Sequence, residues 1–285
     1  MSSVNLSFEF FPPRDVTASF SLWEAAQALL PLAPRHVSVT YGAGGTTRLL
    51  THQTVEALQN QGAEVAAHLT CVDNDRTETL AIAQRYRRAG VRKIVALRGD
   101  APQGEEFAPH PQGFQNSLEL VEALAADGFE VHVGAYPEAH PDSRGTQSDL
   151  EWLRAKFQAG ASTAVTQFFF DAETFLRFRD ACADAGISGQ IVPGILPVHN
   201  WNSVARFAQR CGTTVPTDLA QAFETAQRDG REDLLALAHA AELCSTLIDE
   251  GVEDLHFYTL NRPGLTRDVC RALGVPVEET LRKVA

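Results

Sequence analysis

Positive charge is scarce in this chain of 285 residues. Lysine and arginine together number 24 against 36 acidic residues, which gives a formal net charge of −12. This balance argues against a nucleic acid or an anionic membrane surface as partner, because both attract basic proteins. An anionic ligand must therefore find local basic side chains or backbone N–H donors.

Lysine is rarer still: the sequence contains only Lys93, Lys156 and Lys283. None of them ends an expected strand, which is where parallel α/β enzymes place their chemistry. A Schiff-base mechanism needs a lysine amine as nucleophile, so this distribution argues against one.

Cysteine and histidine lack the spacing of a metal site. The five cysteines are scattered without a Cys-x-x-Cys, and the nine histidines form no His-Glu-x-x-His. We therefore expect no zinc ribbon, no disulfide framework and no metal centre. The N-terminus has no signal-peptide pattern, and no apolar run is long enough to cross a membrane. These absences predict a cytoplasmic protein with mostly buried thiols.

Strand-like apolar runs alternate with helical patterns along the whole chain. The expected strands cover residues 4–10, 36–41, 64–71, 92–97, 130–136, 163–168, 190–195 and 253–258. Strict alternation requires a parallel sheet, and eight such units fit a closed (β/α)8 TIM barrel of the α/β class. We expect a single catalytic domain over residues 1–285. A doubly wound open sheet is the alternative, although it typically has fewer strands.

Glu9 ends the first expected strand and is flanked by Phe8, Phe10 and Phe11. We expect the phenylalanines to remove water from its carboxyl, which raises the pKa of such a group. A carboxyl that stays protonated near neutral pH can donate a proton in catalysis. The alternative is a structural glutamate that caps the next segment or pairs with Arg14.

Polar or aromatic side chains stand at nearly every expected strand end. They are Glu9, Thr40, His68, Arg98, Asp100, Tyr136, Gln167 and Tyr258. In a barrel these ends meet at one rim, where the active site of this fold lies. Asp100 taken alone also reads as an Arg98 partner or a helix cap.

Three further features stay open on the residues alone. His140 is either a loop histidine or a contact to a ligand phosphate. Asp149 and Lys156 are two helical turns apart and share a face, which by itself indicates a solvated surface. The glycines at 42, 44 and 45 do not spell the Gly-x-Gly-x-x-Gly of a Rossmann site.

Eight short motifs follow one another along the chain. They are FEFFPP (8–13), VTYGAGG (39–45), HLTC (68–71), LRGD (97–100), YPE (136–138), TQFFFD (166–171), PGILP (193–197) and HFYTLNR (256–262). The ordered set resembles the methylenetetrahydrofolate reductase family, in its short bacterial form, over practically the whole chain. The resemblance implies a (β/α)8 flavoprotein, a homo-oligomer, and no C-terminal regulatory domain.

The resemblance also implies a reaction. FAD takes hydride from NADH or NADPH and passes it to methylenetetrahydrofolate, which becomes methyltetrahydrofolate, with one site used by turns in a ping-pong sequence. The pathway served would be methionine biosynthesis from one-carbon units. The sequence does not distinguish NADH from NADPH, or one direction of flux from the other.

The family's site residues map onto matching positions of this chain. Glu9 would protonate the bridging nitrogen of the folate, and Asp100 would lie beside the flavin and the pterin. Gln167 would bind the pterin edge, Phe207 would stack on nicotinamide or on the aminobenzoyl ring, and Arg262 would contact the folate tail. FAD would be held by Thr40, Ala43, His68, Arg98, Gly99, Asp100, Tyr136, His140, Asp149 and Lys156. The chain departs from the family pattern at Phe114-Gln115, near the expected FAD edge.

Two other classes are the alternatives. One is another flavin-dependent barrel dehydrogenase, such as a proline-dehydrogenase-like enzyme. The other is a barrel without a cofactor, either a lyase or a binding scaffold.

Overall fold

The computed structural model describes residues 4–41, 48–72, 74–99 and 108–277. Within these residues nine strands form one sheet in which every pair is parallel. The strands are β1 Asn5–Phe10, β2 His36–Val39, β3 Val65–Thr70, β4 Lys93–Leu97, β5 Glu130–Ala135, β6 Ala161–Thr166, β7 Gln190–Val192, β8 Gly194–Ile195 and β9 Asp254–Tyr258. Their order in the sheet is β7-β6-β5-β4-β3-β2-β1-β9-β8.

Pro193 divides the expected strand 190–195 into β7 and β8. The prediction of a single unbroken strand over these residues was therefore wrong. Proline has no N–H for a strand ladder, although its carbonyl oxygen still accepts a hydrogen bond from the backbone N of His256 at 3.1 Å. β7 pairs with β6, whereas β8 pairs with β9. The two ends of the sheet order are therefore two halves of one strand position, which closes the ring and confirms the (β/α)8 barrel.

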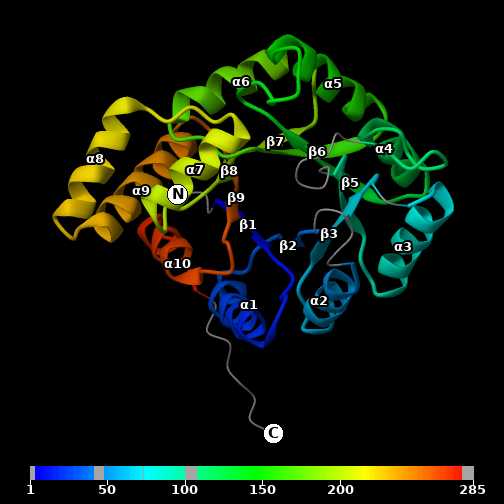
Figure 1. The fold of residues 1–285 in the computed structure, drawn as a ribbon, viewed down its shortest axis with the longest axis horizontal. Helices are drawn as coiled ribbons and strands as arrows, with labels where there is room; N and C mark the ends of the chain where they lie inside the picture. Colours follow the sequence, from blue (N-terminus) through cyan, green and yellow to red (C-terminus); the bar gives the residue numbers. More distant parts are fainter. Residues whose placement is uncertain (1–3, 42–47, 73, 100–107, 278–285) are drawn as a thin grey trace, which may run out of the picture.

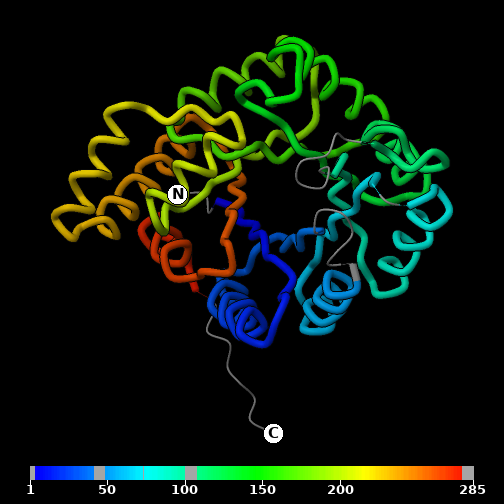
Figure 2. Tube along the Cα trace, in the orientation of Figure 1, coloured from blue at the N-terminus to red at the C-terminus, as the bar shows by residue number. Residues whose placement is uncertain are grey.

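Segments from opposite ends of the chain lie side by side in this ring. β1 and β9 are paired, with Ser7 opposite His256 and Glu9 opposite Tyr258, and Figure 2 shows the two segments together near the centre. β1 also pairs with β2, which places Ser7 opposite His36. These registers set which side chains share a level inside the barrel.

The helices lie outside the strands (Figure 1). They are α1 Val16–Leu29, α2 Arg48–Asn60, α3 Arg76–Arg88, α4 Ser117–Ala126, α5 Thr146–Gln158, α6 Ala172–Asp184, α7 Trp201–Cys211, α8 Thr217–Arg228, α9 Glu232–Asp249 and α10 Pro263–Ala272, with a short 3-10 helix at Leu30–Leu32. In the part of the chain that the structure describes, no helix combines the length and apolarity that a membrane span requires. All five cysteines are free thiols and four of them are buried, as expected.

The first helix begins earlier than its apolar stripe indicates. Sequence periodicity places its start at residue 19, whereas α1 begins at Val16. The side chain of Asp15 accepts a hydrogen bond from the backbone N of Ala18 at 2.8 Å and so caps the helix. This cap satisfies an N–H group of the first turn, which allows the helix to start before its apolar face does.

Strand side chains divide between the helices and the barrel interior. Phe8, Phe10 and Phe257 are fully buried and share one apolar cluster with helix residues such as Leu29 and Val269. A second cluster lies between the strand ends and helices α7, α8 and α9, and it includes Phe168. The alternation of strand side chains thus leaves every second position for the barrel interior.

Candidate active site

A cavity of about 330 Å³ lies at the carboxyl ends of the strands, and we call it the mouth cavity. Its lining includes Glu9, Thr40, His68, Tyr136, Gln167 and Phe207. These six residues come from five strand ends and one helix, and the sequence placed all of them at one rim or in one site. The structure brings them together, as the barrel geometry predicts.

Glu9 projects into the barrel, and its side chain is 15% exposed. Burial raises the pKa of its carboxyl to about 8, so the group keeps its proton at neutral pH. The expected cause was wrong in part. Phe8 and Phe10 are on the opposite face of the strand, against the helices, and only Phe11 reaches the cavity. The barrel interior, not the phenylalanine pair, removes the water.

Two histidines stand next to this carboxyl. Oε2 of Glu9 lies 3.4 Å from Nε2 of His68 and 4.0 Å from Nε2 of His256. Burial lowers the pKa of His68 to about 3 and that of His256 well below its usual range. Both rings are therefore neutral at physiological pH, and Glu9 is the group that carries a transferable acidic proton.

Gln167 and Phe207 bound the cavity on another side. The backbone N of Gln167 donates to the carbonyl of Ala135 at 2.8 Å, and its side-chain oxygen accepts from the backbone N of Phe168 at 3.1 Å. The ring of Phe207, on α7, stacks on Phe168 with centroids 5.3 Å apart. These contacts fix an amide and an aromatic face at the mouth of the barrel.

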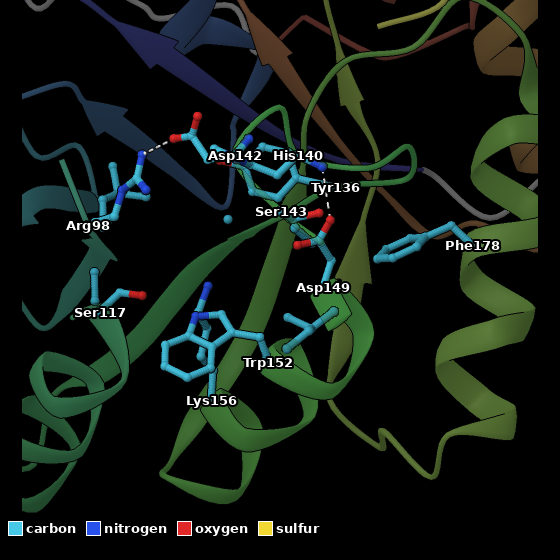
Figure 3. Close-up of a pocket in the computed structure, with 15 residues that line it drawn as sticks. Arg98, Ser117, Tyr136, His140, Asp142, Ser143, Asp149, Trp152, Lys156 and Phe178 are labelled. Carbon is cyan, nitrogen blue, oxygen red and sulfur yellow. Dashed lines mark hydrogen bonds and ion pairs between the residues drawn. The ribbon is translucent and has the colours of Figure 1, made fainter. Parts of the chain in front are cut away.

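A second cavity of about 200 Å³, which we call the basic cavity, lies between the ends of β4 and β5 and helix α5 (Figure 3). Its basic lining residues are Arg98, His140 and Lys156. Lys156 is 8% exposed, and no hydrogen bond or ion pair is found for its ammonium group among the described residues. Burial lowers its pKa to about 8, so much of it remains a cation at neutral pH. An anionic ligand would satisfy such a group.

The other side chains of this cavity are held by specific contacts. Arg98 forms an ion pair with Asp142 at 2.9 Å. The backbone N of His140 donates to Asp149 at 2.9 Å, and Nδ1 of His140 accepts from the backbone N of Asp142 at 3.0 Å. Nδ1 is thereby occupied, which leaves Nε2 as the nitrogen that donates to a ligand. Asp149 and Lys156 face the same cavity and not open solvent.

The two cavities adjoin, so one long ligand could reach from the mouth cavity into the basic cavity. Leu97, Gly134, Ala135 and Tyr136 line both of them. A Cβ atom added at Gly134 would meet nothing closer than Cδ2 of Leu97 at 3.8 Å. The backbone at this position is therefore open to a flat ring system. A dinucleotide has a flat ring and a pyrophosphate, and the mouth and the basic cavity suit these parts respectively. Within the described ranges, no three or more His, Cys, Asp or Glu side chains are arranged so that they could hold a metal ion.

Comparison with known proteins identifies the family. The methylenetetrahydrofolate reductase family model matches residues 1–274. The 5,10-methylenetetrahydrofolate reductase of Escherichia coli is 43% identical over 274 residues, which are 95% of this chain and 91% of that protein. The chain belongs to the methylenetetrahydrofolate reductase family. The 5,10-methylenetetrahydrofolate reductase of Buchnera aphidicola from Acyrthosiphon pisum is 38% identical over 276 residues, 96% of this chain and 93% of that one.

Solved structures at low identity share the fold of this reductase-family chain. One is an uncharacterized Clostridium thermocellum protein that binds two copies of 5-methyl-5,6,7,8-tetrahydrofolic acid, with a TM-score of 0.60 and 10% identity, covering 95% of this chain and 94% of that one. Another is 2,3-dimethylmalate lyase, with a TM-score of 0.53 and 13% identity, covering 95% and 79%. At these identities the likeness concerns the barrel alone.

Two expected site residues of this family member, Gly99 and Arg262, line neither cavity. Ala43 and Asp100 are outside the described residues. Gly99 follows β4 with a φ of +86°, and a Cβ there would meet Cγ2 of Val72 at 2.7 Å. Arg262 precedes α10 and is not among the residues that line the two cavities. Phe114, at the departure from the family pattern, is buried beneath Arg76 and not beside a cavity.

Sequence reasoning missed the histidine lining of the barrel. His36, His132 and His256 all face the mouth cavity of this reductase-family protein. They occupy inward positions of three strands, and a search for histidines with the same strand parity as Glu9 would have found them. Motif spacing could not, because the three are far apart in the chain.

Proposed function

We propose that this chain is an FAD-dependent reductase that converts methylenetetrahydrofolate to methyltetrahydrofolate with hydride from NADH or NADPH. The family match over residues 1–274 supports the substrate and the product. The observation that carries the mechanism is the protonated carboxyl of Glu9, with a pKa of about 8, in the mouth cavity. An acid of this kind at this position suits proton transfer to a bound folate.

FAD, when bound, accepts hydride from the nicotinamide and returns it to the folate. Lys156, Arg98 and His140 would hold its phosphates, because they supply cationic and N–H donors in one cavity. Asp149 positions His140 through the hydrogen bond to its backbone N. Thr40, His68 and Tyr136 would contact the ring end from the mouth. Ala43, Gly99 and Asp100 complete the proposed cofactor contacts.

Glu9 would give its proton to the bridging nitrogen of methylenetetrahydrofolate. Protonation makes that nitrogen a leaving group, so the five-membered ring of the folate opens to an iminium that accepts hydride. Gln167 would orient the pterin through its amide, and Phe207 would stack on the aminobenzoyl ring or, in the other half-reaction, on the nicotinamide. Arg262 would bind the anionic tail, and Asp100 would act beside the flavin and pterin.

The direct test is Glu9→Gln in purified protein that carries its flavin. Flavin reduction by NADH or NADPH should remain within about twofold, because it needs no acid at this position, whereas folate reduction should fall by at least about a hundredfold. Glu24→Gln, at an exposed position on α1, is the matched control and should affect neither step.

Three results would contradict the proposal in different ways. Colourless protein that does not take up FAD would point to a barrel without this cofactor. Turnover of small secondary amines in place of folate would indicate a proline-dehydrogenase-like enzyme. Undiminished folate reduction in Glu9→Gln would leave the reaction in place but remove Glu9 as its acid.

A further inference from the structure

A second group of titratable side chains lies toward the amino ends of the strands, at the opposite end of the barrel from Gln167 and Tyr136. A cavity of about 310 Å³ at this end, which we call the lower cavity, is lined by Ser7, His36, Lys93, Glu130 and His132, among others. Lys93, Glu130 and His36 all begin their strands, which places them at the end of the barrel opposite the mouth. The proposed folate reaction uses none of these side chains.

The lower cavity and the mouth cavity meet inside the barrel. His36, His132 and Val165 line both of them. The two imidazoles are close together, with ring centroids 5.1 Å apart in an edge-to-face arrangement. Two histidines therefore separate Glu9 from the opposite end of the barrel.

Short separations connect these histidines to Glu9. The ring centroid of His36 is 6.3 Å from that of His256. Nδ1 of His256 lies 2.8 Å from Oγ of Ser7, and its Nε2 lies 4.0 Å from Oε2 of Glu9. The 4.0 Å between Nε2 of His256 and Oε2 of Glu9 is a separation that a single bridging water molecule can span. Imidazole rings thus follow one another through the barrel interior from the lower cavity to Glu9.

The lower end of this series reaches solvent through an ion pair. Nε2 of His132 lies 3.0 Å from Glu130, which also pairs with Lys93 at 2.7 Å. The side chain of Glu130 is 43% exposed, whereas His132 is 2% exposed. Its hydrogen bond with His132, together with Lys93, lowers the pKa of Glu130 to about 2. The carboxylate therefore stays ionised and orients the His132 ring through their hydrogen bond.

One ring nitrogen in this series of histidines makes no hydrogen bond to the described residues. Nδ1 of His132 is buried and finds no hydrogen-bond partner among the residues that the structure describes. Burial holds His36 neutral by lowering its pKa to about 3, and the same cause keeps His256 neutral. A neutral imidazole has one donor and one acceptor nitrogen, so it can take up a proton on one and release one from the other.

We propose that the proton returned to Glu9 after each turnover enters from the lower end of the barrel, through His132 and His36, and reaches Glu9 by way of His256. This inference rests on the proposed function. Hydride from NADH or NADPH and one proton from solvent enter each turnover, and the proton ends on the nitrogen that the opened folate ring releases. We call His132, His36 and His256 the relay. Each of these imidazoles takes up one proton and gives up one, so the relay carries the same number of protons after a turnover as before it.

The charged groups around the relay belong to several strands. Glu130 on β5 contacts His132, and Lys93 on β4 pairs with Glu130. Arg35 and Asp254 line the lower cavity together with His36. Arg35 and Asp254 pair with each other at 2.9 Å. Each cation therefore has an acidic partner in the lower cavity. Burial lowers the pKa of His36 most, Lys93 and Arg35 lower it further, and Glu130 acts against them.

The test separates the first turnover from later ones. Glu9 is protonated before the first folate binds, so His132→Gln and His36→Gln should leave both flavin reduction by NADH or NADPH and the first folate reduction within about twofold of the unmodified chain. Steady-state turnover should fall by at least about tenfold, with a larger solvent deuterium isotope effect. Added imidazole should restore part of the loss. Rapid mixing of reduced holoenzyme with methylenetetrahydrofolate measures each step.

His239→Gln is the matched control, since His239 packs against Phe170 and Phe223, outside the relay. It should change none of these rates. Steady-state turnover equal to that of the unmodified chain in His132→Gln and His36→Gln would overturn the relay. So would an equal loss in the first and later turnovers together with a lower free energy of unfolding, because that pattern belongs to a structural role. If the unmodified holoenzyme fails to reduce methylenetetrahydrofolate, the proposed function is wrong and the relay falls with it; failure confined to the variants concerns the relay alone.

Discussion

His68 and Glu9 face each other across the barrel mouth with Nε2 and Oε2 3.4 Å apart, and burial moves their pKa values in opposite directions. The carboxyl rises to about 8, whereas the imidazole falls to about 3. Between these values the carboxylic acid and the neutral ring coexist, so the pair is not a salt bridge at neutral pH. The side chain that sequence reasoning selected as an acid is held in its acidic form by tertiary burial.

The pKa of Glu9 predicts the pH dependence of the folate half-reaction. The rate constant should be constant below about pH 8 and fall about tenfold per pH unit above it, since only the protonated carboxyl can donate. Flavin reduction by the nicotinamide should show no such descent. Stopped-flow flavin absorbance from pH 6 to 10 measures both half-reactions. A folate rate that stays level to pH 10 would contradict the assignment.

The same shift predicts that Glu9 costs stability. Its pKa is raised from 4.5 to about 8 in the folded chain, so the stability present at low pH is lost as the pH rises through this window. Glu9→Gln should therefore raise the free energy of unfolding at pH 8 by about 2–5 kcal/mol while abolishing folate reduction. Urea unfolding at pH 4 and pH 8 provides the comparison, and the gain should be absent at pH 4.

Lys156 offers a test of the cofactor cavity. Lys156→Met should weaken FAD binding by about ten- to a hundredfold, because a charge-assisted contact to a phosphate is lost. Flavin fluorescence titration of the apoprotein measures this affinity. The methionine should not destabilise the apoprotein at pH 7, since it removes a buried cation whose pKa burial lowers to about 8.

The apoprotein also gives a pH signature for this residue. Stability should rise with pH between about 8 and 10.5, where the unfolded chain binds the proton that folded Lys156 has released. This rise should be missing in Lys156→Met. An affinity for FAD equal to that of the unmodified chain would place the phosphates elsewhere.

Gly194 should be essential to barrel closure. A Cβ at this position would lie 2.1 Å from the carbonyl oxygen of Thr166 and 2.6 Å from the ring of Tyr258. Gly194→Ala should lower the free energy of unfolding by about 1–3 kcal/mol or more, because strand backbone must move. Gly264→Ala is the control, since no atom lies within 4 Å of the added Cβ and its φ is not positive. Denaturant unfolding with equal m-values compares the two.

The sequence by itself determined the fold class and the composition of the rim. Alternation of period two in the strands and of period 3.6 in the helices is a local property, so eight βα units could be recognised without any contact between them. A closed parallel barrel collects its strand ends at one mouth, which is why Glu9, His68, Tyr136 and Gln167 could be grouped before their positions were known.

Only the tertiary structure decided which groups lie beside the acid and what their charge is. Glu9 and His256 are 247 positions apart, and register between β1 and β9 joins them. The same strand pleat turns Phe8 away from Glu9, which sequence proximity had suggested as its neighbour. The break at Pro193 and the burial of Lys156 likewise depend on distant segments. Burial and pKa are properties of the packed interior, which forms from residues that are remote in the chain, whereas backbone periodicity is set by near neighbours.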